Sequence, residues 1–186
     1  MTVKVKRCDE RFFQAISRLA NSRVLVGVSE ANAERHEKGT GPGNAALAYI
    51  HERGDPEHGI PARPFLAPGA AAAKPQVAAG LKRAAQLALS GKSPERGLAV
   101  AGSQAVSSVK KVFAHNSWPE VSDAGVASRI RRKEKLKGKK IKRRRPGKFK
   151  KLVDKYPRPV KPLVDSGQLR NSITYVIEEE GRRVTS

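Results

Sequence analysis

The sequence predicts an α+β fold, in which a small antiparallel sheet is packed by two to four helices and a long basic arm precedes the C-terminal hairpin. Three observations predict this fold. Arg23–Val28 and Ser172–Glu179 have the length and the β-branched content of strands. The region between them carries apolar residues at helical spacing. Arg129–Lys161 interrupts this pattern with dense positive charge.

The first residues predict a strand and a helix. Val3–Lys6 alternates valine with lysine, which is typical of a short edge strand. A helix then begins after the capping residue Asp9 and ends near Asn21. Its apolar face consists of Phe12, Ile16 and Leu19.

The next two segments form a strand and a loop. Arg23–Val28 (RVLVGV) is apolar almost throughout, which predicts a central position in the sheet. Ser29–Gly43 is polar and rich in glycine towards its end, so we expect an exposed loop.

A rigid joint is expected between Ala45 and Pro68. A short helix over Ala45–Glu52 ends at Gly54, and a loop leads to the extended segment IPARPFL. Two prolines flank Arg63 in this segment, which restricts the backbone on both sides of its guanidinium. Phe65 and Leu66 follow as a buried anchor.

Two longer helices follow the joint. Gly69–Leu89 forms the first, with Gly91 as its stop. Ser93-Pro94-Glu95 has the cap, proline and acid of a new helix start, and this second helix ends near His115. We expect the two helices to form an antiparallel hairpin or one long broken helix. Many of the residues on their apolar stripes are small, which allows close packing against each other or against a neighbouring subunit. The stripes are Val77, Leu81, Ala84 and Ala88, and then Leu98, Ala101, Ala105, Val109 and Val112.

The positive charge is concentrated in one segment. Arg129–Lys161 holds 18 lysines and arginines and two acids, which accounts for +16 of the chain's net +21. Its prolines argue against a long helix in its second half. We therefore predict a single α+β domain formed by residues 1–128 and 162–186, with residues 129–161 as an extended or partly ordered basic arm.

The C-terminal residues return to globular patterning. Asp165 or Ser166 caps one helical turn that leads into the strand Ser172–Glu179. Glu180-Gly181 permits a hairpin turn, and Arg182–Thr185 forms the return strand.

Composition and motifs exclude several classes of function. Cys8 is the single cysteine, so there is no disulfide framework. No apolar run reaches the length of a membrane span, and the N-terminus lacks the apolar core of a signal peptide. Ser166 does not lie in the G-x-S-x-G motif of a hydrolase nucleophile. Gly39, Gly41 and Gly43 are not followed by the G-K-[ST] sequence that a phosphate-binding loop requires. The positions of His51, Glu52 and His58 do not match the spacing of ligands in any recognised metal-binding motif. We expect no enzyme activity, no metal and no cofactor.

Three blocks of the sequence resemble the minor tail-component or tail-completion family of long-tailed bacteriophages. The first is the VGV strand at Val26–Val28, and the second is A-x-x-x-E-x-G at Ala48–Gly54 followed by IPARPFL at Ile60–Leu66. The third is W-P-x-x-S at Trp118–Ser122, followed after the basic segment by PLVDSGQLRNSITY at Pro162–Tyr175. These blocks cover about a fifth of the chain but span most of its length. The basic segment departs from the family, which usually has a shorter linker there.

The resemblance implies a structural protein of the virion neck or tail end, made in the host cytoplasm. Such proteins are similar to small α+β domains that form a ring, commonly a hexamer, around the DNA channel. The implied partners are the tail tube and the head-tail connector, with packaged double-stranded DNA as a further contact. We expect the subunit or partner interface to contain Glu52, Arg63, Pro64, Phe65, Asp165 and Arg170.

Two of these expectations carry alternatives. Arg63 either pairs with Glu52 inside the fold or reaches a neighbouring subunit. The basic arm either docks on acidic surfaces of adjacent proteins, which we favour slightly, or contacts nucleic acid phosphates without regard to sequence. The alternative function is therefore that of a basic nucleic-acid-binding protein. The cations expected to make either contact are Arg131, Arg132, Lys139, Lys140, Lys142, Arg143, Arg144 and Arg145.

Overall fold

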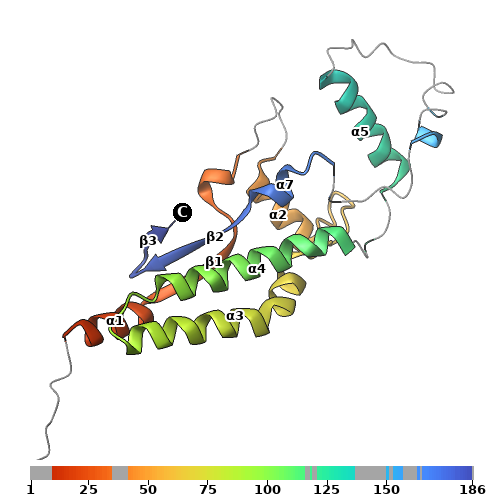
Figure 1. Ribbon diagram of the computed structural model, residues 1–186. Coiled ribbons are helices and arrows are strands. Elements are labelled where there is room, and N and C mark those ends of the chain that lie inside the picture. Colours follow the sequence, from red (N-terminus) through yellow and green to blue (C-terminus); the bar gives the residue numbers. More distant parts are fainter. Residues whose placement is uncertain are drawn as a thin grey trace, which may run out of the picture. The chain divides into compact units, whose positions relative to one another are not determined.

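The protein has an α+β fold made of several helices and one small antiparallel sheet (Figure 1). The computed structural model describes residues 10–34, 42–115, 118, 121–136, 150, 153–156, 163 and 165–185. The chain divides into two compact units. Unit 1 combines Met1–Ala114 with Gln168–Ser186, and unit 2 is His115–Gly167.

The sheet of unit 1 has three strands in the order β1-β2-β3: Ser22–Val28, Ile173–Glu179 and Arg182–Thr185. The predicted central position of β1 is therefore wrong, because the C-terminal strand β2 lies between the other two. The apolar residues of β1 lie on both faces of the sheet, but only one of these faces is covered by the described helices. Val24 packs in the core beneath the sheet, whereas the Leu25 side chain on the opposite face is 48% exposed.

The predicted C-terminal hairpin is confirmed. Glu180 and Gly181 connect β2 to β3, and both have positive φ angles, of 51° and 79°. Two positive φ angles in a two-residue loop match the right-handed twist of the paired strands. The ladder between β2 and β3 shifts register at Ile177 and Glu178.

Two long helices, α3 (Leu66–Leu89) and α4 (Glu95–His115), form the predicted antiparallel hairpin. Glycines bring their backbones together. A methyl group added to Gly80 would lie 2.8 Å from the Ala101 nitrogen, and one added to Gly69 would lie 2.5 Å from the Val109 Cα. Small residues therefore form the contact between the helices.

The predicted stripes on the two helices are largely confirmed. Most of their members are buried: Ala84, Ala88, Leu98, Ala101, Ala105 and Val109. Leu81, however, is 43% exposed. Its neighbour Gly80 makes the contact with Ala101 of α4 instead. On α4, Phe113 is buried and Val112 is only half-buried.

The core of unit 1 lies between the sheet and this hairpin. Ile177 of β2 packs with Ala84 and Leu98, and Val24 joins the cluster from β1. The Tyr175 ring lies directly over Gly102, because a methyl group there would be 2.5 Å from it. The side of β2 that carries Tyr175 and Ile177 therefore faces the helices.

Shorter elements complete unit 1. Helix α1 (Glu10–Ala20) packs against α3, with Phe12, Ile16 and Leu19 half-buried as predicted. The 3₁₀ turn η1 (Glu30–Asn32) lies in the predicted loop, and α2 (Asn44–Arg53) and α7 (Gln168–Ser172) follow in chain order. Val3–Lys6 and residues 35–41 lie outside the described residues.

Unit 2 contains helix α5, Asp123–Leu136. Its core consists of Val126, Ile130 and Val153, with Tyr156 packed against them. Residues 129–136, predicted as the start of the extended arm, are therefore helical. Residues 137–149 lie outside the described part of the chain.

Candidate functional site

Glu52 fastens the end of α2 to the beginning of α3. Its carboxylate accepts hydrogen bonds from the backbone amides of Phe65 (2.8 Å), Leu66 (2.9 Å) and Ala67 (2.9 Å). These amides belong to the first turn of α3, where backbone donors lack helical partners. A carboxylate there also interacts favourably with the positive end of the helix dipole. Glu52, predicted as an interface residue, therefore serves as the N-terminal cap of α3.

The loop between α2 and α3 is held by its backbone. Gly54 ends α2 with a φ angle of 79°, and a methyl group on it would lie 2.8 Å from the Ala62 nitrogen. Asp55 and Ile60 form an antiparallel bridge within the loop. The Arg63 amide donates to the His51 carbonyl at 2.6 Å. The predicted joint is therefore one fixed piece of structure.

Phe65 anchors the joint in the core, as predicted. Its side chain is 0% exposed, and its ring centroid lies 4.8 Å from that of Phe113 on α4. Leu66 is half-buried, and Pro64 is exposed. Since the Phe65 ring lies inside unit 1, it positions the exposed residues around it and does not itself reach a surface.

Arg63 lies beside the buried ring of His51. Burial, together with the positive charge of Arg63, lowers the pKa of His51 to about 4. The His51 Nδ1 atom is buried and has no hydrogen-bond partner in the described part of the chain. His51 is therefore neutral at pH 7, and its protonation would place two positive charges together.

A hollow next to the joint exposes an aromatic side chain. Tyr49 on α2 is 65% exposed, and the Arg53 guanidinium lies 5.6 Å from its ring centroid. Tyrosine and arginine on an apolar floor are the side chains most enriched at protein interfaces. The sequence does not reveal that Tyr49 is exposed, because the spacing of apolar residues along this helix does not determine which face is covered. The hollow is lined by Val28, Ala45, Ala48, Tyr49, Glu52, Arg53 and Leu66.

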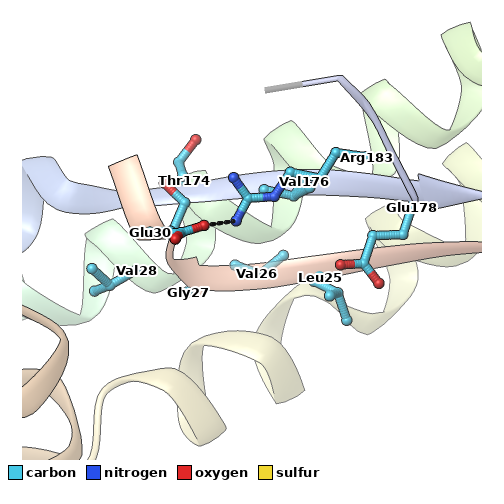
Figure 2. Close-up of a pocket in the computed structure, with 10 residues that line it drawn as sticks. Leu25, Val26, Gly27, Val28, Glu30, Thr174, Val176, Glu178 and Arg183 are labelled. Atoms are coloured by element: carbon cyan, nitrogen blue, oxygen red, sulfur yellow. Dashed lines mark ion pairs between the residues drawn. The ribbon is translucent and has the colours of Figure 1, made fainter. Parts of the chain in front are cut away.

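A second hollow lies on the sheet face opposite the α3–α4 hairpin (Figure 2). Leu25 and Val176 face each other across β1 and β2, and the next pair outward is Gly27 with Thr174. A methyl group on Gly27 would meet no atom within 4 Å. Glu30 pairs with Arg183 at 3.7 Å, and Figure 2 shows this ion pair lying across the face between Thr174 and Val176. This face therefore combines apolar side chains with an ion pair.

The remaining two predicted interface residues belong to other elements of the chain. Asp165 forms an ion pair with Arg132 within unit 2. Arg170 lies on α7 and is exposed. The structure therefore groups Glu52, Arg63, Pro64 and Phe65 at the joint.

The predicted cation cluster is described only at its beginning. Arg131 is exposed on α5, and Lys133 donates to the Tyr156 hydroxyl at 2.9 Å with its ammonium 5.3 Å from the ring centroid. Burial is the main cause that lowers the pKa of Arg129 on the same helix. The other predicted cations lie outside the described residues: Lys139, Lys140, Lys142, Arg143, Arg144 and Arg145.

Within the described ranges, no group of three or more histidine, cysteine, aspartate or glutamate side chains is arranged to hold a metal ion. None of the described helices combines the length and apolarity needed to span a membrane. His58 and Asp55 form a local pair in the joint loop, with Nδ1 2.8 Å from Oδ2.

Comparison with known proteins gives no relative for this chain. No family model, no curated protein and no solved structure matches it.

Proposed function

We propose that this chain is a structural protein of the neck or tail end of a long-tailed bacteriophage. In this proposal it forms a ring, a hexamer, that completes the tail and joins it to the head connector around the DNA channel. It is made in the host cytoplasm and resides in the virion, with the tail tube and connector proteins as its partners. Its action is geometric and involves no catalysis.

One observation carries this proposal: the IPARPFL motif is built as a rigid joint beside an exposed contact surface. Glu52 and Phe65 fix the joint from inside. Tyr49 and Arg53 lie at the surface next to it. A ring needs a contact that holds each subunit at one angle, and a fixed joint with an exposed aromatic residue supports such a contact. The sequence resemblance supports the same conclusion.

The test is the assembly state of the purified chain and its binding to tails. We expect a closed ring by native mass spectrometry and electron microscopy, and capping of purified tails that lack this protein. Tyr49→Ala should weaken ring formation at least about tenfold, as expected of a central aromatic residue. Leu89→Ala, which truncates another exposed apolar residue on α3, is the matched control. A monomer that does not bind tails would refute the proposal.

A second candidate function, that of a basic nucleic-acid-binding protein, rests on the charge of residues 129–161. A net charge of +16 in 33 residues exceeds what solubility requires. Phosphate contacts would release counterions, so the affinity for duplex DNA should fall steeply with salt and be indifferent to sequence. Binding of acidic tail proteins with no binding of DNA at the same salt concentration would favour the docking role for the arm.

A further inference from the structure

We propose that the outer edge of β1 binds a second copy of this chain, β1 against β1, across a two-fold axis. The two sheets then form one continuous antiparallel sheet of six strands. This contact is separate from the Tyr49 surface and does not depend on the proposed ring. It is carried by the unequal protection of the two sheet edges and by the charges at the ends of β1.

The β1 edge lacks the features that usually prevent strand addition. Its seven residues pair with β2 without a register shift, and no described strand or bridge pairs with its other side. After Arg23 it contains no charge and no proline. A regular, uncharged edge of this kind is a template for another strand.

The β3 edge is protected in the usual ways. This strand has four residues, it begins with Arg182 and Arg183, and its ladder contains a register shift. Short length, charge and irregular pairing all disfavour further strands. A dimer through β1 would thus cover the unprotected edge and leave a protected edge at each end.

The register follows from the length of β1. An antiparallel pair centred on Leu25 is the one that matches all seven residues of both copies, from Ser22 to Val28. It places Leu25 opposite Leu25 of the second copy and Val24 opposite Val26. Apolar residues then meet on both faces, and the exposed Leu25 side chain becomes covered.

The charges are complementary in this register. Arg23 lies opposite Gly27 of the second copy. The space next to Gly27 is open, since a methyl group added there would meet no atom within 4 Å. Glu30 follows Gly27 by three residues, and Figure 2 shows its carboxylate on the sheet face between Gly27 and Thr174. In the dimer, an Arg23 side chain of one copy that extends over Gly27 of the other would approach this carboxylate. Glu30 is 89% exposed and its pair with Arg183 is 3.7 Å long, so it remains accessible to a second cation. The two-fold axis repeats this Arg23–Glu30 pair on both sides.

A charge exchange tests the contact in the full chain. Analytical ultracentrifugation should give a dimer for Tyr49→Ala, a background in which ring formation is weakened. In that background Arg23→Glu or Glu30→Arg should raise the dimer dissociation constant at least about tenfold. The chain that carries both Arg23→Glu and Glu30→Arg should have a dimer dissociation constant within about threefold of the background value, because the ion pairs between residues 23 and 30 re-form with reversed charge. Arg182→Glu on the β3 edge is the control and should leave the dimer unchanged.

Cross-linking tests the register. In a Cys8→Ser background, Leu25→Cys should form a disulfide between two copies under mild oxidation, since directly opposed residues on antiparallel strands lie within disulfide range. Val184→Cys on β3 should not. A monomeric Tyr49→Ala chain, single charge reversals without effect, or equal cross-linking at both positions would each overturn the proposal. Failure of this dimer with an intact wild-type ring would leave the proposed function in place.

Discussion

Gly80 of α3 lies so close to Ala101 of α4 that a methyl group on the glycine would stand 2.8 Å from the alanine nitrogen and 2.9 Å from its Cβ. The helices therefore meet backbone to backbone at this point. Gly80→Val should lower the free energy of unfolding by roughly 1–3 kcal/mol, because overpacking forces the helices apart. Chemical denaturation measures this change.

The control for Gly80→Val is Ala79→Val, at the neighbouring exposed position of the same helix. It carries the propensity cost of valine, about 0.5 kcal/mol, without the close approach. Equal effects of the two substitutions would show that the helices do not touch at Gly80.

Removal of the Glu52 carboxylate should weaken the start of α3. Glu52→Ala leaves the amides of Phe65, Leu66 and Ala67 without their acceptor, which should cost about 1–2 kcal/mol of stability. Hydrogen exchange at these amides should accelerate more than exchange at the middle of the helix. Glu57→Ala, an exposed glutamate of the intervening loop, should change neither quantity.

Stability should depend on pH through His51. Its pKa is about 4 in the folded chain and 6.5 in the unfolded chain. Between these values the unfolded state binds a proton that the folded state does not, so stability should fall as the pH falls from about 6.5 towards 4. Above pH 7 the histidine is neutral in both states and contributes no pH dependence.

Comparison with His51→Gln isolates this contribution. Over pH 5 to 6.5, the free energy of unfolding of the variant should depend less steeply on pH than that of the wild type. Parallel curves for the two proteins would show that the pKa of His51 is not lowered by folding.

Arg63→Ala should impair ring assembly while the subunit stays folded. The arginine is half-buried at the joint, and its backbone amide bond to His51 does not depend on its side chain. We expect wild-type circular dichroism and a shift from ring to smaller species in native mass spectrometry. Arg96→Ala, at the beginning of α4, is a matched control for loss of one arginine. A folded Arg63→Ala variant that still forms rings would remove Arg63 from the proposed contact.

The sequence predicted most of the local structure, because the signals for it are local. Gly54, Gly91 and Glu180-Gly181 require positive φ angles, and each ends an element where expected. The helix that begins after Ser93-Pro94 has its predicted start, with the Glu95 amide donating to the Ser93 hydroxyl at 3.3 Å. The apolar stripe predicted the buried face of α4 to within one residue.

The sequence-based predictions were wrong or incomplete where contacts between distant parts of the chain determine the structure. The position of β1 within the sheet depends on β2, whose residues lie far away in sequence. Among the described side chains of α5, Val126 and Ile130 are the buried ones, and so few buried apolar positions among many cations give too weak a period to predict a helix. The partners of Glu52 are backbone amides, which no side-chain motif reveals.

The order of the strands also sets a condition on synthesis. The middle strand of the sheet, β2, begins at Ile173, whereas β1 ends at Val28. On a ribosome, β1 therefore leaves the exit tunnel long before its neighbour exists, and its apolar residues must wait for translation of β2. A chain released before Ile173 would lack both β2 and β3, so β1 would have no partner strand. Chains that end before β2 therefore present an unpaired apolar strand that degradation machinery can recognise.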